Sequence, residues 1–233
     1  MYRTMLVIAV ALLLQSLAPG WNAAAAQTPY PSMAALEQYL ISDENSEIEL
    51  ARTAAPASIS RNAEVMVLRR DGYTTAAKGT NGFVCIVERS WGAATTEPEF
   101  WNPKIRAPIC FNSQAAQTVL PTYLMKTRSI VAGKSAAEVL RATDAAFAGG
   151  KLHAPAPGAM CYMMSHQQYL NDRGKSWHPH LMFFVSGDAA KTWGADLPGV
   201  PVMAANDPEE RITTMMVLVG HWSDGTAIAV DEH

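Results

Sequence analysis

The chain has 233 residues, of which 49% are hydrophobic and 17% are charged, and its formal net charge is -3. This apolar content excludes an intrinsically disordered chain and a collagen-like fibre. Without a basic excess there is no surplus of Lys and Arg to neutralise phosphates, which argues against a nucleic-acid-binding protein. The length predicts one domain, or at most two, with enough chain to form a hydrophobic core.

The N-terminus has the three parts of a secretory signal peptide, which we assign to residues 1–26. Arg3 is the only charged residue before an apolar run over residues 5–14. Ala24 and Ala26 supply the small side chains that precede a cleavage site. The run is shorter than the ~20 apolar residues that a bilayer crossing requires, so we expect no transmembrane anchor after cleavage. The sequence therefore predicts a periplasmic or secreted protein.

Residues 27–58 are predicted to form an N-terminal helical segment, followed by a single α+β domain over residues 59–233. Apolar side chains recur at helical spacing over residues 36–40. Asp43 is then expected to cap a second helix, which Pro56 ends.

Strand-like alternation of apolar and polar side chains follows in three runs, over residues 64–70, 73–78 and 83–88. The runs are separated by Asp71-Gly72 and by Asn81-Gly82, two dipeptides that favour tight hairpin turns. We therefore predict a three-stranded antiparallel meander.

The second half of the chain predicts an irregular segment over residues 89–112, then one helix and three further strands. The helix is expected from Ser135 to Phe147, with Ser135 and Glu138 as a capping box and Gly149 at its end. The further strands are expected over residues 159–164, 180–185 and 212–221. Strands, a helical insert and more strands, without regular alternation, indicate an α+β fold with an antiparallel sheet.

Three cysteines, Cys85, Cys110 and Cys161, allow one disulfide and one free thiol. Disulfides persist in the oxidising compartments that exported proteins reach. We expect the bond to join Cys85 to Cys110, because these two bracket a segment rich in turn residues that has little regular structure to hold it. Cys161 is then a buried thiol among apolar neighbours, and the alternative is a catalytic nucleophile.

Four short segments resemble a group of uncharacterised secreted bacterial proteins. They are Gly79–Cys85, Pro108–Cys110, Met160–Met163 and Pro179–Phe183. The resemblance extends over about residues 43–225 and implies secretion and a shared fold. It implies no catalytic residue, because the group has no established activity.

The residues that we single out as metal ligands lie in the segment Trp177–Phe184. In an extended strand, His178, His180 and Met182 project from one face. Two imidazoles beside a thioether suit copper or zinc better than calcium or magnesium, which prefer oxygen. The further ligands would come from His221, His166 or Glu88.

A different interpretation of the same segment has no metal. Pro179 cannot donate to a sheet ladder, so it can mark the point where a loop enters an edge strand, with both histidines solvated. Met182 would then fill space in the core.

Other polar and aromatic groups were considered as sites. His221, Ser223 and Asp224 lie close together in sequence, but neighbours in a strand cannot aim at one another, so we interpret Ser223–Gly225 as a turn. The carboxylate pairs Glu97 with Glu99 and Glu209 with Glu210 are interpreted as solvated loop charges.

Five tryptophans lie in or beside predicted loops: Trp91, Trp101, Trp177, Trp193 and Trp222. Aromatic side chains in such places line pockets for sugars, peptides or other flat ligands, and we select Trp177 and Trp222 as ligand-binding residues. The alternative is that these indoles cover a small core as lids.

These observations favour an exported module that binds a small ligand or a metal at the end of its sheet. One alternative is an exported hydrolase, in which a histidine acts as a general base or a metal-bound water attacks. Another is a non-catalytic interaction protein whose loop tryptophans face a partner.

Overall fold

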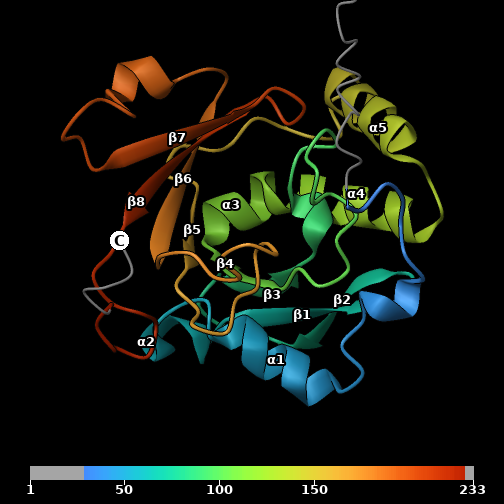
Figure 1. Cartoon of the computed structure of the whole chain (residues 1–233), viewed down its shortest axis with the longest axis horizontal. Coiled ribbons are helices and arrows are strands. Elements are labelled where there is room, and N and C mark those ends of the chain that lie inside the picture. The colour runs from blue at the N-terminus through green and yellow to red at the C-terminus, as the bar shows by residue number, and fades with distance from the viewer. Residues whose placement is uncertain (1–28, 229–233) are drawn as a thin grey trace, which may run out of the picture.

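The computed structural model describes residues 29–228, and within that range the chain forms one open eight-stranded sheet with helices on both faces (Figure 1). The strand order is β2-β1-β3-β4-β5-β6-β8-β7. Neighbouring strands are antiparallel except β1 and β3, which are parallel. The α+β class is thereby confirmed. The predicted signal peptide over residues 1–26 lies outside the described residues.

The elements follow one another without regular alternation of strands and helices. The strands are β1 Glu64–Arg69, β2 Gly72–Ala77, β3 Val84–Glu88, β4 Ala107–Phe111, β5 Met160–Met163, β6 His180–Ser186, β7 Val202–Asp207 and β8 Ile212–Leu218. The α-helices are α1 Glu44–Arg52, α2 Ala57–Ser60, α3 Ser113–Thr118, α4 Leu120–Val131 and α5 Ala136–Ala148. Short 3-10 turns are η1 Leu36–Gln38, η2 Ser90–Gly92 and η3 Ala190–Trp193. Within the described part of the chain, no helix has the length and hydropathy that a membrane crossing requires.

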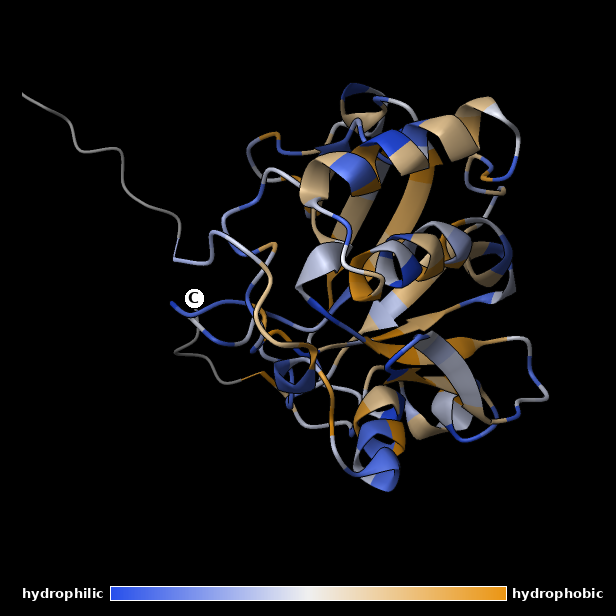
Figure 2. Cartoon of the chain, turned by 90° about the vertical axis from the view of Figure 1, so that its right-hand side faces the viewer, coloured by the Kyte–Doolittle hydropathy of each residue, from blue (hydrophilic) through white to orange (hydrophobic). Residues whose placement is uncertain are grey.

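One face of the sheet, which we call the α1 face, is closed by α1 over β1, β3 and β4. Its core consists of small side chains around the Cys85–Cys110 disulfide, including Ala51, Val65 and Val87. The predicted disulfide is confirmed, and it joins directly opposite residues of β3 and β4. In Figure 2 the strands between the helical layers are coloured mainly as hydrophobic.

The opposite face, which we call the α4 face, carries the larger core. It is covered by α3 and α4, and α5 packs on α4 (Figure 1). Alternation along the strands sends Ile86, Ile109, Phe111 and Cys161 to this face, while their neighbours Cys85 and Cys110 point to the α1 face. Cys161 is buried and free, as predicted. The side chains on this face also surround the candidate site described below.

Several local sequence signals give the predicted structures. Asp43 caps α1 by accepting a hydrogen bond from the Ser46 amide at 2.8 Å. The predicted β1–β2 hairpin forms, but its two turn residues are Arg70 and Asp71. Gly72 is the first residue of β2 and has a φ of 125° that favours glycine. At α5, the Ser135 amide donates to Glu138 at 2.9 Å in the expected capping box, and Gly149 ends the helix.

The predicted meander is wrong, because β3 pairs with β1 and not with β2. After β2 the chain crosses the start of β1, where a Cβ on Gly79 would lie 2.1 Å from the Glu64 nitrogen. Only glycine allows this crossing, and it delivers β3 to the far side of β1. Asn81-Gly82 turns the chain into β3 rather than forming a hairpin.

Other elements differ from their predicted ranges. β4 lies inside the segment expected to be irregular, and Pro108 is tolerated there because the β4–β5 ladder pairs only Cys110 and Phe111. β7, α3 and α4 were not predicted. The helical turn expected at residues 36–40 is one 3-10 turn, and α1 ends at Arg52, before Pro56.

Candidate functional site

The predicted metal ligands His178 and His180 lie where a loop enters β6. His180 is the first residue of the strand and is buried, and its ring meets Trp177 edge-on at 4.7 Å between centroids. His180 Nδ1 lies 2.7 Å from the His178 carbonyl oxygen. Because a carbonyl only accepts, this nitrogen carries the proton. Burial lowers the pKa of His180, so the imidazole is neutral.

The remaining predicted ligands do not complete a metal site. His221 is exposed and forms an isolated β-bridge with Ala227. Met182 lies on the α4 face and lines a different hollow from His178. Across residues 29–228, no three His, Cys, Asp or Glu side chains are grouped so that they could hold a metal ion. The prediction that His178 projects from the same strand face as His180 was wrong, because β6 begins only at His180.

His166 lies beside a hydroxyl group as in a catalytic triad, but the hydroxyl donates its hydrogen bond to a carboxylate and not to the imidazole. His166 Nε2 lies 2.7 Å from Thr226 Oγ1, and that hydroxyl donates to Asp224 at 2.6 Å. The hydroxyl proton is therefore directed to Asp224 and not to the imidazole, so the threonine is not activated as a nucleophile. Ser223–Gly225 forms the predicted turn, with the Gly225 amide donating to the Trp222 carbonyl.

The predicted ligand-binding residues Trp177 and Trp222 line one hollow of about 300 Å³, together with His178, Gly174 and Ser176. Trp222 is buried, and its indole stacks on His166 at 4.0 Å between ring centroids. The structure thus brings the two tryptophans together. Because Trp222 is largely covered, this hollow offers less ring surface to a ligand than two exposed indoles would.

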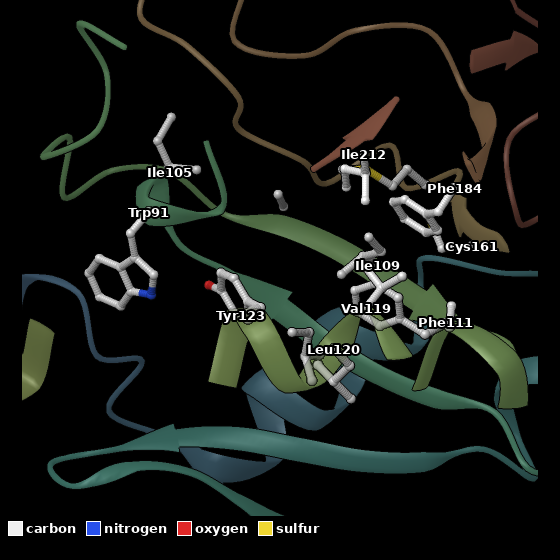
Figure 3. Close-up of a cluster of buried hydrophobic side chains, with 14 of the residues drawn as sticks. Trp91, Ile105, Ile109, Phe111, Val119, Leu120, Tyr123, Cys161, Phe184 and Ile212 are labelled. Carbon is white, nitrogen blue, oxygen red and sulfur yellow. The ribbon is translucent and has the colours of Figure 1, made fainter. Parts of the chain in front are cut away.

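A second hollow of about 240 Å³, which we call the Glu88 chamber, lies on the α4 face of the sheet. Most of its lining is apolar, and Figure 3 shows Phe184 and Ile212 lying next to Ile109, Phe111 and Val119. Its other lining residues are Gly92, Tyr123, Met163, Met182, Thr214 and three acids, Glu88, Asp207 and Glu210. An apolar hollow with a few polar groups is the usual form of a small-molecule site.

Glu88 is the last residue of β3, and strand alternation places it on the same face as Ile86. Gly92 lies close to its carboxyl group: a Cβ there would come within 3.0 Å of Glu88 Oε2. Among the described residues, no hydrogen bond or ion pair to the Glu88 carboxyl is found. Glu88 is partly buried, and a carboxyl group that loses hydration without gaining a partner is costly, which makes Glu88 the most unusual group in the chamber.

Glu210 has the partner that Glu88 lacks. It follows β7, in the turn that leads to β8, and accepts a hydrogen bond from Lys126 Nζ of α4 at 2.8 Å. The Lys126 ammonium, 2% exposed, also donates to the Ala93 carbonyl at 3.1 Å. The prediction that Glu209 and Glu210 are solvated loop charges was therefore wrong for Glu210, which is tied to a buried lysine.

Burial dominates the protonation of both acids. It raises the pKa of Glu88 to about 8, with Glu210 raising it further and Lys126 opposing the change. Burial also raises the pKa of Glu210, which Lys126 counteracts. Burial alone would lower the pKa of Lys126, but Glu210, Asp207 and Glu209 outweigh it and the pKa is raised. Lys126 is therefore a fixed cation, and Glu88 exchanges a proton near neutral pH.

The other two acids of this turn have structural contacts. Asp207 lines the chamber and accepts a hydrogen bond from the Glu210 amide at 3.0 Å, which fixes the β7–β8 turn. Glu209 accepts from the Thr95 amide at 3.0 Å and from the Thr95 hydroxyl at 2.7 Å. The chamber thus has apolar walls and one strongly acidic end.

Only part of this site has a local signal in the sequence. Glu88 was considered only as an extra metal ligand, although its place at the end of the apolar run Val84–Val87 already put a carboxyl group on a buried face. Lys126 and Glu210, which pair with each other at this site, are 38 and 122 residues away from Glu88 along the chain. No local pattern could bring these three together.

Comparison of the chain with known protein families, with curated proteins and with solved structures finds no match.

Proposed function

We propose that this chain is an exported protein that binds one small, largely apolar molecule in the Glu88 chamber. The observation that carries the proposal is the unpartnered Glu88 carboxyl at the end of an apolar hollow of about 240 Å³. At about 30 Å³ for each water, such a space corresponds to roughly eight waters. The ligand is therefore of fragment size, with one polar group at the acidic end.

Export is part of the proposal and rests on two supports. The first is the signal-peptide pattern over residues 1–26. The second is the Cys85–Cys110 disulfide, since such bonds persist in oxidising compartments and are rare in reducing ones.

The walls around the polar group favour binding through burial of apolar surface. Phe111 and Phe184 stack with ring centroids 6.2 Å apart, and both line the chamber beside Met163 and Met182. Methionine side chains adapt to differently shaped ligands because they are flexible and polarisable. The lining therefore selects for size and apolar character more than for one exact shape.

The test uses small uncharged alcohols as probes, namely benzyl alcohol, 2-phenylethanol and cyclohexylmethanol, with binding measured by calorimetry and by amide chemical shifts. We expect millimolar or tighter binding, with shifts at residues that line the chamber. Thr214→Trp should abolish probe binding, because Thr214 lines the chamber from β8 and an indole there would occupy the space of the ligand.

Ala205→Trp is the matched control. Ala205 lies directly opposite Thr214 on β7 and on the same face of the sheet, but it is exposed and does not line the chamber. Binding should survive this change. The proposal is wrong if none of the probes binds the unaltered protein, or if the two variants lose binding equally while both remain folded.

A hydrolase is the second candidate, and one observation favours it. Glu88 and Glu210 lie at the same chamber but differ in partners, and such pairs with different environments serve as acid and base in enzymes. Incubation of 2-phenylethyl acetate with the protein, followed by mass spectrometry, tests it. Release of the alcohol that Glu88→Gln abolishes would favour catalysis over binding alone.

A further inference from the structure

The charges around the Glu88 chamber are unbalanced, and this imbalance defines the kind of ligand. Three carboxyl-bearing residues line it, Glu88, Asp207 and Glu210, and no basic residue does. Lys126 lies next to the lining, but its ammonium is bound to Glu210 and to the Ala93 carbonyl. One acid is therefore compensated, Asp207 accepts only an amide hydrogen bond, and Glu88 has no partner of either kind among the described residues.

Each class of ligand would meet this end of the chamber differently. An anion would be repelled by Asp207 and Glu210 and would find Lys126 already occupied. A purely apolar molecule would leave the Glu88 carboxyl enclosed and unpartnered, which costs free energy. A cation would supply the missing counter-charge in surroundings where a charge pair is screened less than in water.

We propose that the ligand is a small organic monocation, an alkylammonium or arylalkylammonium ion whose charged group pairs with Glu88 while its apolar body lies against Phe111 and Phe184. This inference rests on the proposed function, because it names the ligand class of the same chamber. Gly92 supports it, since the lack of a side chain there leaves the space beside Glu88 Oε2 open. The aromatic rings also favour a neighbouring cation.

The experiment compares three probes of similar shape and different charge: 2-phenylethylammonium, 2-phenylethanol and phenylacetate. Calorimetry on the mature protein should show the ammonium ion binding about tenfold or more tightly than the alcohol, and no binding of phenylacetate. In Glu88→Gln the preference for the ammonium ion should disappear, while the alcohol still binds.

Glu209→Gln is the matched control for charge alone. It removes a carboxylate from the same turn, but Glu209 is held by Thr95 and does not line the chamber. The ammonium ion should bind this variant within about twofold of the unaltered protein, because a charge outside the lining is screened.

The outcomes separate the two proposals. If the alcohol binds the unaltered protein as tightly as the ammonium ion, or if Glu209→Gln weakens the ammonium ion as much as Glu88→Gln does, the monocation inference fails and the binding function stands. If none of the three probes binds, the binding function itself fails. Retention of the ammonium preference in Glu88→Gln would also overturn the inference.

Discussion

Glu47 is a buried residue and Glu88 a partly buried one, and the two lie on opposite sides of the sheet with opposite surroundings. Glu47, on α1, accepts hydrogen bonds from Arg89 Nη2 at 2.8 Å and from the Leu68 amide at 3.2 Å. Arg89 also donates to the Tyr39 carbonyl at 2.6 Å. Glu88, which precedes Arg89 in the sequence, has no such partner within residues 29–228. The comparison distinguishes a carboxyl group whose partners lie within the protein from one that lines a hollow and has no partner among the described residues.

Strand alternation explains how two adjacent residues reach such different places. At the end of β3, Glu88 points to the α4 face and Arg89 turns toward Glu47 and α1. On the α1 side the space is filled by α1 and the disulfide, and the Glu47 carboxyl finds its partners within the protein. On the α4 side a hollow remains, and the missing partner of Glu88 can come from a ligand.

The largest expected effect is the difference in the free energy of unfolding that is lost when each of the two carboxyl groups is removed. Glu47→Ala should lower the free energy of unfolding by about 3–5 kcal/mol, because it leaves the Arg89 guanidinium buried without a counter-charge. Glu88→Ala should lower it by less than about 1 kcal/mol, since among the described residues the Glu88 carboxyl makes no hydrogen bond or ion pair that would be lost. Urea denaturation measures both. Equal losses would show that Glu88 is a structural group like Glu47.

The disulfide tests whether the two sides act independently. Replacing Cys85 and Cys110 together by Ala opens a loop with a sequence separation of 25 residues and should lower stability by about 3 kcal/mol in the chain-entropy model. Because both cysteines point to the α1 face, binding of 2-phenylethanol in the chamber should persist in the folded variant. Loss of binding without unfolding would contradict the separation of the two faces.

A smaller effect is expected in the pH dependence of stability. Burial and Glu210 raise the pKa of Glu88 from about 4.5 to about 8, so the folded chain holds this proton more tightly than the unfolded chain. The contribution of Glu88 to the free energy of unfolding is fully present below about pH 4.5 and is lost as the pH rises to about 8. Relative to Glu88→Gln, the free energy of unfolding of the unaltered protein should fall across that window. If the difference in free energy of unfolding between the unaltered protein and Glu88→Gln stays constant from pH 4 to pH 9, the pKa of Glu88 is not raised by folding.

Local sequence patterns predicted the parts of this fold that local chemistry determines. The Ser135–Glu138 capping box, the Asp43 cap and the β1–β2 hairpin each depend on residues a few positions apart. The position of β3 was missed because it depends on a backbone crossing at Gly79 rather than on the turn at Asn81-Gly82. β7 was missed because four of its six side chains are small or polar, as suits an edge strand.

The candidate site was predicted less well than the fold, for a physical reason. Its acidic end combines Glu88 from β3, Lys126 from α4 and Glu210 from the turn before β8, and only the folded chain brings them together. The histidines near β6 attracted attention because they are close in sequence. In the structure His180 is a neutral buried residue bound to the His178 carbonyl.

The most direct test of this account is the ¹³C NMR titration of the Glu88 side-chain carboxyl, assigned by its absence in Glu88→Gln. The account predicts a midpoint at a pKa of about 8 in the free protein, and a lower midpoint when 2-phenylethylammonium is bound. A midpoint near 4.5, unchanged by the ammonium ion, would show that Glu88 is solvated like an ordinary surface carboxyl group and would contradict the account.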